Sequence, residues 1–488
     1  DAALVALGSS EADALLRSLT SREILVQQDQ SRFPGTKEYL FKHALVRDVA
    51  YDSLDRAHRE ELHALAGRWL STLGEDAATV AGHLDLGGQS TLASHYWEIA
   101  AERALTANAL ADALTMAERA LAFAETSTTG FRRASYLDEA FHRLDPRSAD
   151  RESAVSAMED YAYDETTRVL AEGARARFDD ARGGGPEVNE RLARVRDAAA
   201  RLGRSDEVAR CSAALASRAA FRGDFAVAEA EAKRLLDLSL HEVHGARVDA
   251  YQTLAIIRQA KGAVSLALDA RRSAVQAARA ASLKEREAIL TTNLGFALSS
   301  VGARVEAREA LQSGFVLAET IGSPAAVRHA QMNLLGWTSL YGNDRRLDAH
   351  LAETRAEADA VAASQWAAPD RSNLGVIFYR GAELLRSNSD VALERARTLL
   401  RMAVESYRNL GHLDVLPVAL GMWAEAERLC RRVEEARTVA AEAATLLSSG
   451  APSLLNEAPV FLTLFKCCND LGDEDGALFA TRERARVA

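Results

Sequence analysis

Residues 294–314 read LGFALSSVGARVEAREALQSG, and this stretch holds the core of the repeat that decides the fold. Small residues stand at Gly295, Ala307 and Gly314, separated by twelve and then seven positions. Small side chains at such points let two antiparallel helices cross at a short distance. Gly302, between the first two, marks a tight turn. The stretch therefore predicts two paired helices joined by a short connection.

The same pattern recurs before and after this stretch. A Leu followed by a small residue returns at intervals of 39, 40 and 41 positions, in Leu215-Ala216, Leu254-Ala255, Leu294-Gly295 and Leu335-Gly336. Glycines mark equivalent turns at Gly223, Gly262 and Gly302, and Ser323-Pro324 supplies an N-cap followed by a first-turn proline. A period of about 40 residues is typical of stacked helical hairpins, which present a surface rather than an enclosed active site.

Composition supports an almost all-α fold and limits the partners. Apolar residues make up 48% of the 488 residues, charged residues 26%, and the few prolines fall where helices should begin or end. The net charge of −11 argues against nucleic acid as the main partner. The four cysteines form no disulfide or zinc spacing, and no apolar run is long enough for a membrane helix. We expect a cytoplasmic protein, and a start without Met is consistent with a fragment.

The N-terminal region differs from the repeats. An amphipathic helix is predicted from Ser10-Glu11, followed by two β-prone runs at 24–28 and 39–41 around a Pro34-Gly35 turn, and by a second helix. Helix, hairpin and helix together outline a small winged-helix unit. We predict a winged-helix remnant with its connecting helix over 1–75, irregular helical hairpins over 76–190, and a superhelix of such hairpins over 191–488, whose register is clearest from about 205 to 366. Residues 126–152 are poorly patterned.

The twelve-then-seven spacing resembles the tetratricopeptide repeat (TPR), in an extended form with units of about 40 residues. The resemblance implies a right-handed superhelix with a concave groove that binds proteins or peptides. Leu235, Asp348 and Arg355 depart from it, because they occupy places where the family has small residues.

A second resemblance lies at residues 38–54, EYLFKHALVRDVAYDSL, followed by Arg59-Glu60-Glu61-Leu62-His63. This segment is similar to the one that follows the nucleotide-binding module in bacterial STAND-type signalling ATPases, which are often fused to cyclase, kinase or transcription-factor domains. The similarity covers about residues 10–125. No G-x-x-x-x-G-K-[ST] motif occurs in the sequence, so the resemblance implies an upstream nucleotide-binding module outside this chain.

Residues that carry catalytic or metal chemistry are not grouped in recognisable motifs. His43, His58, His63, His83 and His95 cluster near the N-terminus, but His58 and His63 are five positions apart rather than the three or four that place two ligands on one helix face. We expect structural or capping roles for them. The sequence predicts no enzyme, no cofactor and no metal site.

The best candidate site is a series of amides. Asn293, Asn333 and Asn373 are spaced at 40 and 40, next to the Leu-Gly signature, and Gln252 lies one repeat earlier. On the first helix of each hairpin, such amides can pair with a peptide's C=O and N–H together. Apolar pockets beside them are predicted from Phe296, Trp337 and Tyr341. The alternative is that these amides satisfy neighbouring helix ends.

The predicted function is therefore protein or peptide recognition, as the sensor arm of a larger signalling ATPase that can form oligomers. Two other functions stay open. One is a free-standing adaptor that bridges two proteins, and the other is a transcription regulator whose winged helix contacts DNA.

Overall fold

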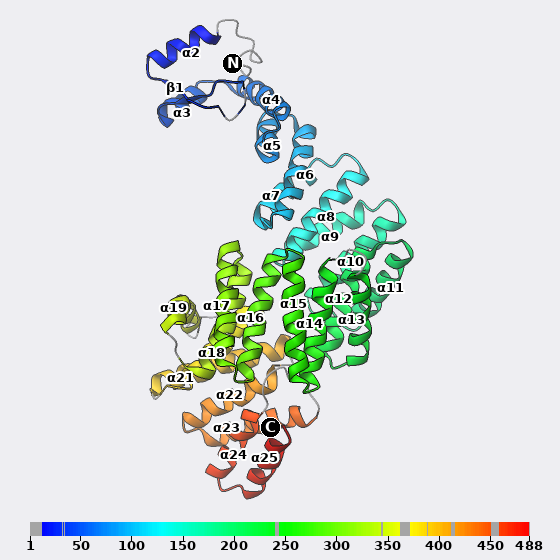
Figure 1. Ribbon diagram of the computed structural model, residues 1–488, viewed down its shortest axis with the longest axis vertical. Coiled ribbons are helices and arrows are strands. Elements are labelled where there is room, and N and C mark those ends of the chain that lie inside the picture. The colour runs from blue at the N-terminus through cyan, green and yellow to red at the C-terminus, as the bar shows by residue number, and fades with distance from the viewer. Residues whose placement is uncertain are drawn as a thin grey trace. The chain divides into compact units, whose positions relative to one another are not determined.

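A computed structural model of the chain describes residues 12–31, 33, 35–239, 244–342, 345–361, 371–387, 389–410, 415–449 and 458–487. The chain divides into two compact units, Asp1–Val188 (unit 1) and Asn189–Ala488 (unit 2). Helices dominate both units (Figure 1).

The described part of unit 1 opens with the predicted helix, hairpin and helix, while the predicted helix start at Ser10-Glu11 lies outside the described residues. Helix α2 (Ala12–Ser21) leads into strands β1 (Leu25–Gln27) and β2 (Tyr39–Phe41), which pair antiparallel. Helix α3 (Ala44–Asp52) follows and buries none of its residues. The order of these elements is confirmed, whereas their identity as a winged helix stays a prediction.

Seven further helices of unit 1 follow as packed neighbours: α4 (Arg56–Thr72), α5 (Ala77–Leu86), α6 (Ser90–Thr106), α7 (Leu110–Leu121), α8 (Ser127–Leu144), α9 (Ala149–Asp160) and α10 (Glu165–Ala181). The stretch 126–152, poorly patterned in sequence, forms α8 and the start of α9, joined by a short connection at 145–148. Its polar residues include helix caps: Thr126 forms a capping box with Thr129, and Ser148 accepts from the backbone N–H of Asp150. The polar caps weakened the apolar pattern without interrupting the helices.

Unit 2 continues the series of helices, with bounds as follows: α11 (Glu187–Arg201), α12 (Ser205–Phe221), α13 (Phe225–Ser239), α14 (His244–Ala260), α15 (Val264–Ala280), α16 (Lys284–Ser300), α17 (Arg304–Ile321), α18 (Pro324–Tyr341), α19 (Arg345–Val361), α20 (Arg371–Leu384), α21 (Asp390–Leu410), α22 (Leu416–Leu429), α23 (Val433–Ser448), α24 (Ala458–Asp470) and α25 (Glu474–Val487). Successive helices pack as hairpins, and α14 to α17 stand side by side in Figure 1. The predicted all-α fold of TPR-like hairpins is confirmed.

The predicted turns lie where the glycines are. Gly262 and Gly302 have φ of +71° and +81°, the left-handed region that ends many helices. Past Gly302, the N–H of Ala303 donates to the carbonyl oxygen of Leu298, which closes a Schellman-type end. Ser323 caps α18 with Pro324 in its first turn, as predicted.

Small residues sit at the closest helix crossing. A Cβ atom on Gly295 of α16 would lie 2.7 Å from Leu311 Cγ and 2.9 Å from the carbonyl oxygen of Ala307, both on α17. One on Gly314 of α17 would lie 2.5 Å from the Thr292 side chain of α16. Each helix therefore needs a glycine where the other approaches, which confirms the role predicted for these positions.

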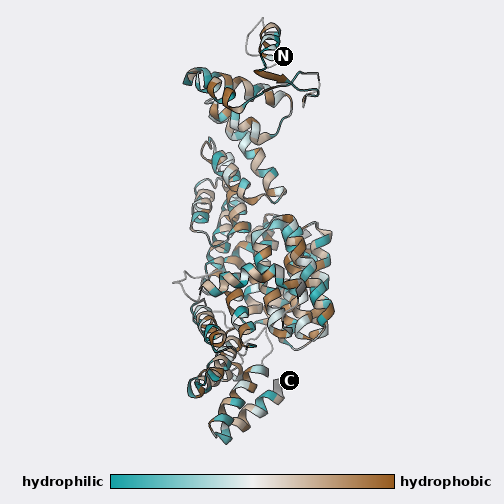
Figure 2. Cartoon of the chain, turned by 90° about the vertical axis from the view of Figure 1, so that its left-hand side faces the viewer, coloured by the Kyte–Doolittle hydropathy of each residue, from teal (hydrophilic) through white to brown (hydrophobic). Residues whose placement is uncertain are grey.

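The core is built largely from alanine and leucine between helices. Figure 2 shows apolar and polar residues alternating around the helices. In the cluster that joins α16 to α19, Leu311, Leu334, Leu335 and Trp337 are all 0% exposed. Each hairpin covers the apolar face of the next, so neighbouring repeats stabilise one another.

Candidate peptide-binding site

The predicted amides lie on the first helices of successive hairpins, α14, α16, α18 and α20. Across the repeats, α16 packs on α18 and α18 packs on α20, whereas α16 reaches α14 through the side chain of Arg286. Gly336 of α18 lies against the Phe296 ring of α16, and Gly375 of α20 lies against Met332 of α18. The first helices therefore form a continuous row from α16 to α20 that can support one extended site.

Asn293 and Asn333 touch each other. The Nδ2 of Asn333 donates to the Oδ1 of Asn293 at 3.1 Å, and Nε2 of His329 lies 2.7 Å from the same oxygen. Asn293 is partly buried, whereas Asn333 is only 3% exposed. The structure thus brings these two predicted residues together and adds His329, which sequence reasoning missed.

The burial of Asn333 follows from the repeat register. Asn293 stands one residue before Leu294 of its signature, while Asn333 stands two residues before Leu335. One residue turns a helix by about 100°. The equal 40-residue spacing therefore does not give equivalent positions. Asn333 points between the helices, where it reaches Asn293, and does not share the partly exposed helix face that Asn293 occupies. Asn373, one residue before Leu374, is partly buried on α20.

Gln252 is held in the same way as Asn293. Its Oε1 accepts from Nη2 of Arg286, one repeat later, at 3.1 Å, and the same guanidinium pairs with Asp249. In both places a side chain of the following hairpin fixes the amide oxygen. The NH₂ groups of Gln252 and Asn293 have no hydrogen-bond acceptor among the described residues.

The three predicted aromatic residues belong to the helix packing. Trp337 is 0% exposed, so its ring fills the core, and the expectation that it lines a ligand pocket is corrected by this burial. Tyr341 packs on Trp337 with ring centroids 5.3 Å apart and donates to the carbonyl oxygen of Ser299. Phe296 packs on Tyr379 at 5.5 Å and stays partly exposed. Phe296 and Tyr341 retain surface that a ligand can contact.

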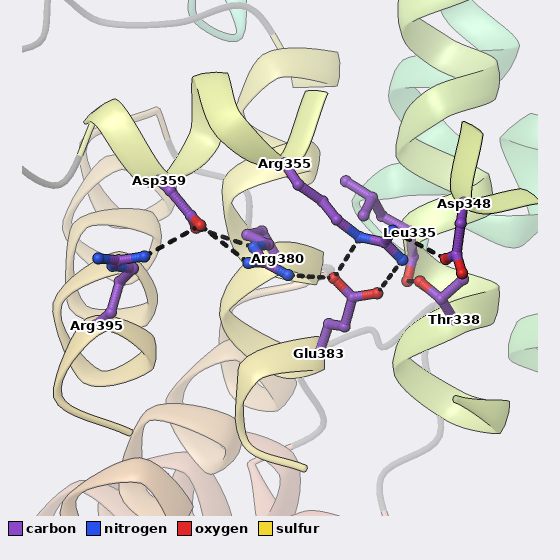
Figure 3. Close-up of polar contacts among 8 residues, drawn as sticks. All are labelled: Leu335, Thr338, Asp348, Arg355, Asp359, Arg380, Glu383 and Arg395. Atoms are coloured by element: carbon purple, nitrogen blue, oxygen red, sulfur yellow. Dashed lines mark hydrogen bonds and ion pairs between the residues drawn. The ribbon is translucent and has the colours of Figure 1, made fainter. Parts of the chain in front are cut away.

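Beside this row, a series of ion pairs joins α19, α20 and α21 (Figure 3). Arg355 of α19 binds both carboxylate oxygens of Glu383 of α20, at 3.0 and 2.6 Å, and also pairs with Asp348 at 3.0 Å. Arg380 of α20 donates to the same Glu383 at 2.6 Å. We call this series of ion pairs, which also includes Asp359 and Arg395, the ionic junction.

The ionic junction continues from Arg380 to a second carboxylate. Arg380 donates two hydrogen bonds of 2.9 Å to Asp359 of α19, and Arg395 of α21 adds one of 3.2 Å. Three arginines thus alternate with Asp348, Glu383 and Asp359, so the charges balance and the arrangement is structural. Two of its pairs are bidentate, the strongest form of this contact.

Burial and hydrogen bonding act against each other on Glu383. Burial alone raises the pKa of its carboxyl, but the hydrogen bonds from Arg355 and Arg380 outweigh burial, and the pKa is lowered. Glu383 therefore stays ionised between the two guanidinium groups. Asp348 and Arg355, at positions where the repeat prefers small residues, were the signal in sequence that this hairpin is built differently.

Unit 1 contains a second polar contact that sequence spacing did not pair. His63 of α4 and His83 of α5 face each other with their Nδ1 atoms 3.0 Å apart, and the hydroxyl of Tyr51 lies 2.9 Å from Nε2 of His63. Burial lowers the pKa of both histidines. His58 lies 2.8 Å from Asp55, the N-cap of α4. Within the described ranges, His, Cys, Asp and Glu side chains form no group of three that could hold a metal ion.

Comparison with known proteins leaves the family open. No protein-family model and no curated protein matches the chain. Among solved structures, yeast Tom70 aligns at 13% identity over 89% of this chain and 93% of its own, with a TM-score of 0.36. A STAND protein with a tetratricopeptide repeat sensor from Pyrococcus horikoshii aligns at 13% identity with a TM-score of 0.27.

The alignment with the STAND protein covers 96% of this chain but 57% of that protein. TM-scores at this level assign neither a family nor a function, so the fold follows from the helical hairpins themselves. None of the helices in the described residues is both long and apolar enough to span a membrane.

Proposed function

We propose that this chain is a protein-recognition scaffold that grips an extended peptide along the first helices α14 and α16. One observation carries the proposal. Gln252 and Asn293, one repeat apart, each have an amide oxygen fixed by the following hairpin and an NH₂ group with no acceptor among the described residues. Fixed donors at a repeat spacing suit the regularly spaced carbonyls of an extended backbone.

Preorganisation supports this reading of the two amides. Arg286 and His329 hold the amide planes before a ligand arrives, so less side-chain entropy is lost when the ligand binds. Phe296, three residues after Asn293 on α16, and Tyr341 on α18 supply partly exposed aromatic surface. Asn333 acts as a support that orients Asn293 rather than as a ligand contact.

The test replaces each NH₂ donor with an oxygen of nearly the same shape. Peptides selected from a random display library on the full chain should bind the Gln252→Glu, Asn293→Asp double variant at least about tenfold more weakly, the loss expected for hydrogen bonds at an interface. Gln276→Glu on α15, an exposed position, is the matched control and should bind as the parent does. Equal binding by the double variant and the control would remove the proposal.

We further propose that the scaffold is the sensor arm of a larger cytoplasmic STAND-type signalling ATPase, as the resemblance of residues 38–54 implies. Ligand binding would then change the ATPase through a shift between two arrangements. A P-loop encoded upstream, with ATP hydrolysis that responds to a selected peptide, is the expected result. Hydrolysis that ignores every such peptide, or a complete gene without a P-loop, favours the free-standing adaptor.

The surface of α3 favours a protein partner over DNA for the N-terminal elements. Leu45 and Val49 are 75% and 63% exposed, and apolar side chains of this kind do not bind phosphate. Binding of duplex DNA by the full chain that weakens steeply with salt would contradict this assignment.

A further inference from the structure

Arg271 occupies a core position of its hairpin. It lies on α15, four residues after Ala267 and three before Ala274, so it shares a helix face with these two small crossing residues. The corresponding residues of four other second helices are all apolar and at most 1% exposed: Ala117, Ala232, Leu311 and Ala440. The repeat therefore uses this position for packing, and an arginine there needs a separate explanation.

The guanidinium of Arg271 has no partner among the described residues. Its Nε is buried without a hydrogen bond, and burial lowers its pKa, with no carboxylate of the described residues close enough to oppose that effect. Other buried arginines are paired: Arg133 donates to Glu98 at 2.8 Å, and Arg151 donates to Asp138 at 2.7 Å. Arg271 is thus a partly buried positive charge without its counter-charge.

A group that pairs with the Arg271 guanidinium would be a hydrogen-bond acceptor with negative charge. A guanidinium has five N–H donors and no acceptor, and its planar fork matches a carboxylate or a phosphate through two parallel hydrogen bonds. Arg271 is only partly buried, and of its polar atoms only Nε is both enclosed and unpaired. The two Nη atoms make no hydrogen bond and therefore keep access to solvent. A ligand can therefore reach them from outside.

We propose that Arg271 anchors a binding site for one oxyanion, a carboxylate or a phosphate group, carried by a ligand of this protein. The ligand class rests on the proposed recognition function, whereas the anion site itself follows from the unpaired guanidinium. Binding neutralises a charge that the helices have already partly removed from water, so the interaction is stronger than at an exposed arginine.

The experiment uses the full chain and two anions as probes, inorganic phosphate and acetate, with chloride holding the ionic strength constant. The side-chain Nε–Hε resonance of Arg271, assigned by its loss in Arg271→Leu, should shift saturably with at least one anion. The melting temperature of the parent should rise with the same anion. Leucine stands at the corresponding position of α17, so Arg271→Leu is expected to fold, and it should lose the rise in melting temperature.

Two controls separate the possible results. Arg272→Leu, at the exposed neighbouring position, should keep the full response, and Arg271→Lys should weaken the affinity by about tenfold because lysine lacks the planar fork. A response to phosphate alone identifies a phosphoryl group, and a response to acetate alone identifies a carboxylate. Either result supports the site. A response that persists in Arg271→Leu, or no response to either anion, overturns it.

The proposals of an anion site and of a peptide site can be tested independently. The Gln252→Glu, Asn293→Asp variant, which is expected to lose peptide binding, should keep the shift of the Arg271 resonance with the anion. If the selected peptides bind normally while neither anion shifts the Arg271 resonance, the recognition function is supported and the anion site is disproved.

Discussion

The α16–α17 and α18–α19 hairpins come from adjacent repeats, and their second helices, α17 and α19, are held in place by different forces. Between α16 and α17, Gly295 and Gly314 allow backbones to meet, and the contact is the most extensive between two helices in the described chain. Between α18 and α19 the contact is much smaller, and Asp348 and Arg355 stand where small residues would be. The ionic junction ties α19 to α20 and α21 instead.

This difference shows that one period can encode two kinds of joint. Close packing depends on shape and responds little to salt or pH. Paired charges depend on ionisation, and their contribution changes with conditions even where burial limits screening. We therefore expect α19 to separate from its neighbours under conditions that leave α16 and α17 together.

The largest effect should come from filling the close crossing. Gly295→Leu would push a side chain into Leu311 and the backbone of Ala307, which cannot move away without separating the helices. We expect a loss of about 3 kcal/mol in the free energy of unfolding of unit 2, measured by urea denaturation.

A matched glycine tests whether the loss comes from the crossing. Gly245 lies in the first turn of α14, where only an arginine side chain at 3.7 Å would meet a new Cβ. Gly245→Ala should leave stability unchanged or raise it by up to about 1 kcal/mol, because alanine favours helix. Similar losses for both variants would mean that Gly295 has no special packing role.

The sequence predicts the small residues of the α16–α17 crossing better than the ion pairs of α19. The spacing of Gly295, Ala307 and Gly314 was sufficient to predict the first hairpin, because small residues at a crossing are a local requirement. Asp348 and Arg355 signalled that the second hairpin departs from the pattern. Their partners Glu383 and Asp359 were not predictable, since ion pairs across helices depend on side-chain reach and not on a period.

The candidate site was predicted less well than the fold, for a related reason. Asn293 and Gln252 lie on first helices of their hairpins, as predicted, but Asn333 turns inward because its repeat is one residue out of register. Trp337, which the sequence predicts to line an apolar pocket, is fully buried. Spacing alone does not fix which face of a helix is open once repeats differ in length.

The next largest effect should come from the centre of the ionic junction. Glu383→Gln removes the charge between Arg355 and Arg380 and keeps the shape of the side chain. Each arginine retains one other carboxylate, so we expect a loss of about 2 kcal/mol rather than the larger cost of a fully unpaired buried charge. Hydrogen exchange of α19 and α20 should rise, while that of α16 and α17 should not.

The double variant with Arg355→Met sharpens this result. Removing both partners should recover part of the loss, because no buried guanidinium then faces an uncharged amide at that contact, while Asp348, which also loses Arg355, has a side chain that is 36% exposed to water. If the two substitutions add without recovery, Glu383 and Arg355 do not act as a pair.

A smaller effect is expected from acid. The pKa of Glu383 is lowered below its ordinary value near 4.5, so its contribution to stability is complete above that value and is lost as pH falls through the lower pKa of the folded state. Hydrogen exchange of α19 should therefore increase below about pH 4.5, before that of α16 and α17. In Glu383→Gln the early increase should shrink, and an unchanged acid response would assign it to other carboxylates.

The smallest effect should come from the outer end of the ionic junction. Arg395 is 43% exposed in its side chain and makes a single bond of 3.2 Å to Asp359, which Arg380 already binds in a bidentate pair. Exposed pairs contribute little, so Arg395→Ala should cost less than about 0.5 kcal/mol. Arg380→Ala is the matched variant, because it removes the partly buried contact to the same Asp359 and should cost several times more. Equal losses would show that exposure does not set the strength of these pairs, and the contrast between packed and ionic hairpins would then need another cause.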